Sequence, residues 1–262
     1  MVFSPEWQQN LYTFLAVLSR VASFWVALPI LRRGVPLLAK VGMAGLISLL
    51  LLPVTAPLPV PESLIRFAFT IVRESLFGLL LGFLVALVFS TLYLAGQLID
   101  VQMGFGAVTL FDPQTGDHVP MVAQFQNALA VLLFFLTDGH HALFAALGQS
   151  FLIVPLSGAV LSDRAIQHVF DLFVSMFVLS LRIALPVMAA VFLTDVALGI
   201  ITRAVPQMNV FVIGFPVKIA VGLAIYLLAL PAIVSLLTSL VGPGGRLSEG
   251  VGGVLPLLGG GP

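Results

Sequence analysis

Residues 75–99 read SLFGLLLGFLVALVFSTLYLAGQLI and contain no Asp, Glu, Lys or Arg. A helix that crosses the hydrocarbon core of a membrane, about 30 Å thick, needs about 20 consecutive and mostly apolar residues. This stretch is long enough, so the sequence predicts a transmembrane helix here.

Five further stretches have a similar length and polarity, and together with the first they predict six spans. Three are uncharged, residues 41–61, 118–137 and 219–245, whereas residues 11–30 contain Arg20 and residues 169–196 contain Asp171, Arg182 and Asp195. Residues 139–162 are also uncharged, but glycines and a proline interrupt them. We expect that segment to be re-entrant, interfacial or a short extra helix.

The overall composition supports a membrane protein without a separate soluble domain. Hydrophobic residues make up 60% of the chain and charged residues only 8%, whereas soluble domains carry about 25% charged residues. Basic and acidic residues balance at 11 each, which removes the case for a basic nucleic-acid-binding face. We therefore expect an all-α membrane protein that has no nucleic-acid partner.

Residues 1–240 are expected to form a single integral membrane domain. Pro29, Pro186 and Pro216 lie within or at the ends of apolar stretches, where each removes a backbone donor, so we expect hairpins of kinked or broken helices. Residues 241–262 are rich in glycine and proline, and we expect this tail to be disordered.

The loop between the third and fourth predicted spans combines many glycines with bulky apolar residues, which a purely solvated loop would lack. The bulky residues are Met103, Phe105, Leu110 and Phe111. Irregular backbone at membrane depth is tolerated only inside protein or around a water-filled cavity. The pattern therefore indicates a packed constriction element.

Charged residues inside predicted spans are candidates for function, because each is costly at the bilayer centre unless it is paired or hydrated. The candidates are Arg20, Glu74, Arg182 and Asp195. Each charge is equally consistent with pairing to a neighbouring helix or subunit. Arg73 and Glu74 stand at the start of their span, where they could also extend to the interface.

The sequence contains no motif for an enzyme or a cofactor. G-x-S-x-G and H-E-x-x-H are absent, and the lack of cysteine excludes thiolate metal sites and cysteine nucleophiles. Asp138, His140 and His141 have side chains that can bind metal or transfer protons, but a turn that ends a helix at the membrane interface explains them better. We predict no catalysis, no cofactor and no metal.

Several strings along the chain are more specific than its composition: GQLID at residues 96–100, QMGF at residues 102–105, Asp112-Pro113 and RAVPQMNVFVIGFPVK at residues 203–218. In their order and spacing these strings resemble the FliR family of flagellar type III export-gate proteins. The resemblance extends from residue 20 to residue 230. The family motif is carried by Arg203, Pro206, Gln207, Asn209, Phe211, Gly214, Pro216 and Lys218.

This resemblance implies a core subunit that forms a pore for unfolded flagellar proteins with FliP-like and FliQ-like subunits, and that associates with an FlhB-like protein. It implies a multi-pass protein of the bacterial inner membrane, in the flagellar basal body. The family's plug loop maps onto about residues 102–117, with Gln102, Met103, Gly104, Phe105, Gly106, Leu110, Phe111, Asp112 and Pro113 as its gating residues.

Two alternatives stay open from the sequence. One is the homologous subunit of a virulence injectisome, although Asp112-Pro113 favours the flagellar system. The other is a proton-coupled transporter, which would use Glu74, His140, Arg182 or Asp195 as a relay.

Overall fold

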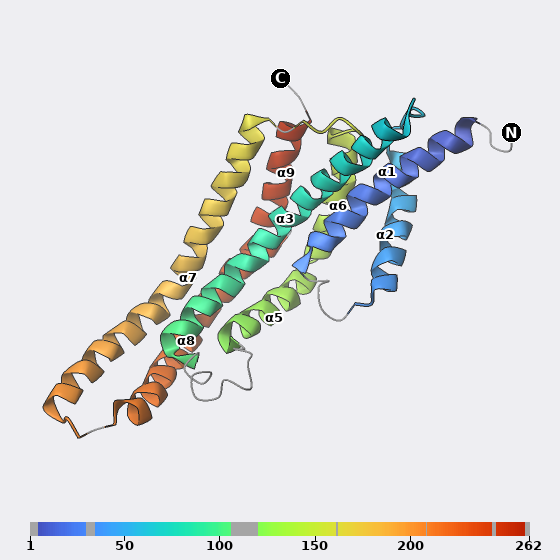
Figure 1. Ribbon diagram of the computed structural model, residues 1–262. Helices are drawn as coiled ribbons and strands as arrows, with labels where there is room; N and C mark the ends of the chain where they lie inside the picture. The colour runs from blue at the N-terminus through green and yellow to red at the C-terminus, as the bar shows by residue number, and fades with distance from the viewer. Residues whose placement is uncertain are drawn as a thin grey trace. The chain divides into compact units, whose positions relative to one another are not determined.

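The computed structural model describes residues 5–29, 35–105, 120–160, 162–207, 209–242 and 245–259, and every regular element within these ranges is a helix. Figure 1 shows the helices in chain order. They are α1 (Pro5–Ala27), α2 (Leu37–Leu51) with the short 3₁₀ turn η2 (Leu52–Val54), α3 (Leu64–Met103), α5 (Met121–Leu136), α6 (Gly139–Ile153), α7 (Asp163–Ala204), α8 (Val210–Val241) and α9 (Arg246–Leu258).

Proline and asparagine mark several of the helix boundaries. Pro36 and Pro120 directly precede α2 and α5, where the missing N–H of proline does no harm. Pro206 follows the end of α7, and a residue before proline is disfavoured in the helical conformation. Asn209 directly precedes α8 and caps its N-terminus, because its side-chain oxygen accepts a hydrogen bond from the Val212 N–H at 3.4 Å.

The predicted all-α membrane fold is confirmed. Five helices are long and apolar enough to cross a membrane, and α5 with α6 makes a sixth if this pair, bent by 72°, is one span. The second helix of the pair, α6, lies within residues 139–162, the segment that the sequence left open between a re-entrant piece, an interfacial piece and a short extra helix. The helices α3 and α7 have 40 and 42 residues. At a rise of 1.5 Å per residue each is about 60 Å long, roughly twice the hydrocarbon thickness.

The expected disordered tail is wrong for residues 246–258, which form α9. Val254, Leu255 and Leu258 of this helix are buried on one face, which packs against α6. One of the glycines that suggested disorder lies at a close contact, since a β-carbon on Gly253 would lie 3.1 Å from His168 Nε2, whereas a β-carbon on Gly252 would meet nothing within 4 Å.

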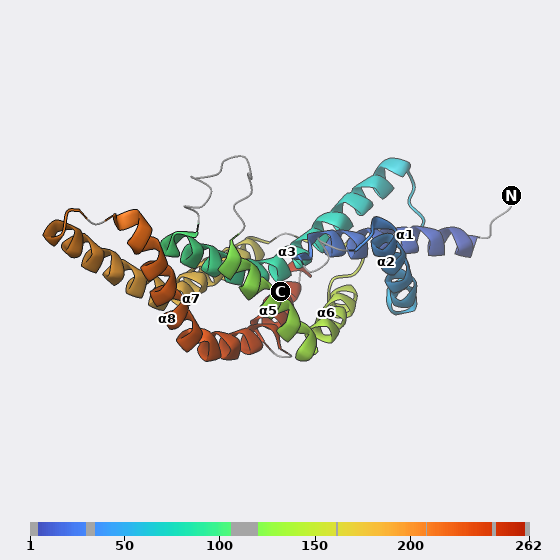
Figure 2. The same ribbon diagram turned by 90° about the horizontal axis from the view of Figure 1, so that it is seen from below.

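The helices divide between two compact units, and α3 and α7 contribute to both. The first unit contains residues 1–87, 138–173 and 242–262. In its described part, α1 lies beside α2 in both views (Figures 1 and 2). Its core includes Val17, Val21, Phe77, Leu81 and Phe151.

The second unit contains residues 88–137 and 174–241. There, the last part of α7 and the first part of α8 form a hairpin (Figure 1), and α5 packs against α8. Its core includes Phe89, Leu92, Ile99, Phe134 and Val191. Whether the two units act as one membrane domain, as the sequence predicts for residues 1–240, stays a prediction.

Candidate functional site

The stem of the glycine-rich loop is the part of this loop that the structure describes. Gln102 and the fully buried Met103 end α3, and Gly104 and Phe105 follow them. Five of the predicted gating residues, Gly106, Leu110, Phe111, Asp112 and Pro113, lie outside the described residues.

Asp100 connects the two ends of this loop. Its side chain is completely buried in the last turn of α3, and its two carboxylate oxygens accept hydrogen bonds from the backbone N–H groups of Val122 at 2.9 Å and Ala123 at 3.0 Å. These donors belong to the first turn of α5, where a helix has N–H groups without partners of its own and favours a negative charge. The carboxylate therefore holds the end of α3 to the start of α5.

Two glycines allow the stem to pack this closely. A β-carbon on Gly96 would collide with the backbone of Ala123, so only glycine lets α3 and α5 approach at this point. Gly104 has a φ of 86°, a left-handed conformation that side chains with a β-carbon rarely adopt. A β-carbon there would also lie 2.7 Å from the ring of Phe215 in α8.

Met103 makes a second contact between the stem and α8. A β-carbon on Gly222 would lie 2.6 Å from the terminal methyl group of Met103, so the glycine leaves the space that this side chain fills. Met103 and Gly104 thus rest on α8 two turns apart, at Gly222 and Phe215. The start of the loop is fixed by α8 as well as by α5.

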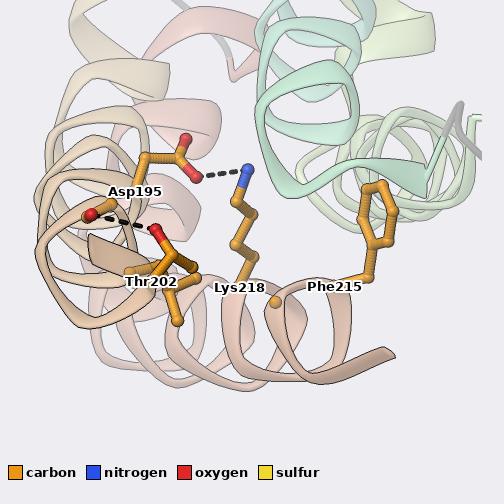
Figure 3. Close-up of a pocket in the computed structure, with 7 residues that line it drawn as sticks. Asp195, Thr202, Phe215 and Lys218 are labelled. Carbon is orange, nitrogen blue, oxygen red and sulfur yellow. Dashed lines mark hydrogen bonds and ion pairs between the residues drawn. The ribbon is translucent and has the colours of Figure 1, made fainter. Parts of the chain in front are cut away.

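A cavity of about 220 Å³ lies beside this stem and contains an ion pair (Figure 3). Lys218 Nζ contacts Asp195 Oδ1, and their side chains are 23% and 35% exposed. Phe215 lies one turn before Lys218, and it therefore belongs to both the cavity and the stem contact. The cavity is lined by Asp195, Leu198, Gly199, Thr202, Gly214, Phe215 and Lys218.

The family motif at residues 203–218 takes the chain from α7 into α8. Arg203 lies in the last turn of α7, where a cation is favourable, and Pro206 and Gln207 are exposed in the connection. Gly214 is buried at the cavity, and Pro216 lies inside α8. The position of the Phe211 side chain is outside the described part of the structure.

Arg20 and Glu74 form a separate, fully buried ion pair in the first unit. Arg20 Nε donates to Glu74 Oε2 at 2.6 Å, and both side chains have 0% exposure. The other carboxylate oxygen accepts from the Ser157 N–H at 2.8 Å. Arg20 Nη1 donates to the carbonyl oxygens of Ser150 at 3.0 Å and Val154 at 3.1 Å. The pair therefore ties α1, α3 and the end of α6 together.

Two aromatic rings complete the surroundings of Arg20. Its guanidinium carbon lies 4.5 Å from the ring centre of Phe77 and 4.3 Å from that of Phe151. Such cation–π contacts stabilise a desolvated cation. Arg20 and Glu74 thus pair with one another, as the sequence allowed for charges inside spans, although Nη2 of Arg20 has no hydrogen-bond partner among the described residues.

Arg182 is the remaining candidate among the charges inside predicted spans. Arg182 is exposed on α7, and none of the described carboxylates lies within ion-pair distance of it.

Asp138, His140 and His141 cluster at the start of α6, with ligand atoms within 4.8 Å of one another. Their geometry is compatible with a metal ion, and the prediction that none is bound stays a prediction.

Asp100 and Phe215 are the site residues that the sequence did not single out. Both stand in strings that carry the resemblance, but their roles depend on contacts with residues 22 to 23 and 111 positions away, because Asp100 bonds Val122 and Ala123 and Phe215 contacts Gly104. The one local signal is Pro120, which marks a helix start whose free N–H groups need an acceptor.

The described helices and the site define a membrane protein with several candidate spans and two internal ion pairs. A family model described as "Bacterial export proteins, family 1" matches residues 11–243. The chain belongs to this family of bacterial export proteins, and the resemblance to FliR is confirmed.

Two of the curated relatives described next carry the name FliR, and the third is a translocation protein. The chain is 32% identical to the flagellar biosynthetic protein FliR of Bacillus subtilis over 224 residues, which cover 84% of this chain and 86% of the relative. It is 31% identical to FliR of Escherichia coli over 233 residues, covering 88% and 89%. It is 27% identical to the Yop proteins translocation protein T of Yersinia pestis over 222 residues, covering 82% and 84%.

Proposed function

We propose that this chain is a core subunit of the flagellar type III protein export gate in the bacterial inner membrane. With FliP-like and FliQ-like subunits and an associated FlhB-like protein, it forms the pore for unfolded flagellar proteins in the basal body. It is required for flagellum assembly and catalyses no reaction. The observation that carries this proposal is the identity of 31–32% to two FliR proteins over more than 80% of each chain.

The geometry of the loop stem supports a gating role for residues 102–117. A loop that closes a pore must be held at a defined place while its middle can move. The Asp100 carboxylate holds both ends of the loop, and Gly104 is packed against Phe215. The sequence of the loop adds glycines and bulky apolar side chains, and hydrophobic constrictions exclude ions by excluding water.

The homologous subunit of a virulence injectisome is the second candidate function. The likeness to the Yersinia pestis translocation protein supports it, at 27% identity. The two functions differ in the phenotype of a gene deletion. The flagellar role predicts cells without flagella whose swimming returns when the gene is supplied again. Normal flagella in the deletion strain would contradict it.

Affinity purification from the native membrane tests the proposed assembly. A tag placed after residue 262 should copurify FliP, FliQ and FlhB homologues, identified by mass spectrometry against an untagged control. The chain should also be less stable when produced alone, since prolines such as Pro186 and Pro216 leave backbone groups that partners can satisfy. A stable chain that copurifies none of these homologues would contradict the proposal.

A further inference from the structure

A second cavity, of about 410 Å³, lies in the first unit between α3, residues 159–160 and α9. Its volume falls within the range of ligand pockets, about 300–1,000 Å³. Among the described residues that line it almost all are apolar, and Arg73 is the one charged side chain. The apolar lining consists of Leu76, Phe77, Leu80, Ala159, Val160 and Leu258.

Arg73 is a cation without a matching anion among the side chains that the structure describes. Its Nη2 donates to the carbonyl oxygen of Ala159 at 2.5 Å. No described carboxylate lies within ion-pair distance of it. The neighbouring Glu74 is committed to Arg20 and to the Ser157 N–H. Arg73 is exposed, so an anion can reach it from outside.

The position of Arg73 makes the missing anion significant. It lies in α3, which is long and apolar enough to span a membrane, and charged groups in such segments are normally paired. A ligand for this site therefore needs an anionic group for the guanidinium and an apolar part for the cavity next to it. A membrane phospholipid has both, with its phosphate at one end and its acyl chains at the other.

We propose that Arg73 and the cavity beside it bind one anionic phospholipid, with the lipid phosphate on the guanidinium and an acyl chain against Leu76, Leu80 and Leu258. Basic pockets between membrane helices bind anionic lipid headgroups. Arginine suits this role because its planar group can donate two parallel hydrogen bonds to a phosphate. The site is independent of the proposed export function.

The closing side of this cavity is provided by α9. Leu258 is buried, its carbonyl oxygen accepts a hydrogen bond from the Val160 N–H at 3.0 Å, and the Leu257 carbonyl oxygen accepts from Ser162 Oγ at 2.9 Å. These bonds attach the end of α9 to Val160 and Ser162, next to Ala159, whose carbonyl oxygen accepts the hydrogen bond from Arg73. The family model ends at residue 243, before α9 begins. The lipid site is therefore completed by a helix outside the shared family region.

Native mass spectrometry of the purified complex, with phosphatidylglycerol added, tests this proposal. The parent complex should retain phosphatidylglycerol in preference to zwitterionic phosphatidylethanolamine. Arg73→Gln should weaken the retention about fivefold, the contribution of one basic side chain at an anionic membrane surface. Leu76→Trp should also weaken it, because the indole fills the cavity from its exposed rim, where Leu76 is 61% exposed.

Arg66→Gln is the matched control. Arg66 lies two turns earlier in α3 and is paired with Glu62, so its replacement should leave lipid retention unchanged. Equal retention by the parent and Arg73→Gln would overturn the proposal, as would equal retention of the two lipids. Full displacement of the lipid by inorganic phosphate would show an anion site without an acyl-chain site. A crosslink from residue 76 to a partner subunit in the parent complex would show that protein covers the cavity.

Discussion

The two ion pairs that the described helices enclose, Arg20 with Glu74 and Lys218 with Asp195, differ in how far they are buried. Arg20 and Glu74 are both 0% exposed, and every carboxylate oxygen and two guanidinium nitrogens have protein partners. Lys218 and Asp195 border a cavity and are 23% and 35% exposed. The first pair has no room to change partners, whereas the second can exchange its contact for water.

This difference separates structural charges from charges that are available for function. Transferring an ion into the protein interior costs several kcal/mol, and good geometry with additional hydrogen bonds is needed to offset that cost. Arg20 and Glu74 meet this requirement and lock three helices together. Lys218 and Asp195 share their cavity with Phe215, whose ring lies next to Gly104 of the loop stem.

The largest effect is expected from Glu74→Ala. It leaves Arg20 buried without its carboxylate, and removing one partner of a buried pair costs about 3–5 kcal/mol. We expect little folded protein in membrane extracts and a strongly lowered thermal midpoint. Glu62→Ala is the control, because it removes an ion pair at the start of the same helix, between Glu62 just before α3 and Arg66 within it, whose side chains are 78% and 70% exposed. Equal thermal midpoints for Glu74→Ala and Glu62→Ala would contradict the inference that the buried Arg20–Glu74 pair holds the three helices together.

An intermediate effect is expected from Gly104→Ala. A side chain at a left-handed φ costs about 1–2 kcal/mol, and the new methyl group also displaces the Phe215 ring. Thermal unfolding of the complex measures the loss. Gly45→Ala is the matched control, since a β-carbon on Gly45 in α2 meets nothing within 4 Å and alanine favours a helix. If both variants melt like the parent, the stem contact carries no stability.

The smallest effect on stability is expected from Asp195→Ala, because Lys218 can remain hydrated in the cavity. We expect a normal amount of assembled complex and reduced swimming in soft agar. The charge exchange Asp195→Lys with Lys218→Asp should restore part of the swimming, since the pair can form again. Parent-like swimming of Asp195→Ala would show that the pair is not used in export.

The sequence predicted the helical membrane class because hydropathy and span length depend only on local composition. The segment after residue 138 was ambiguous, since its glycines and Pro155 fit a re-entrant piece as well as a helix, and the structure has a bent pair there. The tail was predicted wrongly because glycine in a helix normally costs stability, about 1 kcal/mol relative to alanine, and the close packing of Gly253 on His168 is a long-range contact.

The candidate site was predicted less well, for a related reason. Charges could be listed from the sequence, but their partners could not, because Arg20 and Glu74 are 54 residues apart and Arg20 also bonds Ser150, 130 residues away. Asp195 and Lys218 were both named without being paired. The role of Asp100 depends on where α5 begins relative to α3, and this register comes only from tertiary packing.

Ion conductance through the purified complex in planar bilayers tests the central proposal, that the loop at residues 102–117 closes the resting pore and that Asp100 holds the two ends of this loop. Asp100→Ala removes the acceptor for two N–H groups, and hydrogen bonds to a charged group contribute about 1.5–3 kcal/mol each. We predict higher resting conductance than in the parent with unchanged copurification of partners, a smaller rise for Asp100→Asn, and the largest rise after deletion of residues 105–115. A deletion complex that assembles normally and conducts no more than the parent would contradict the claim.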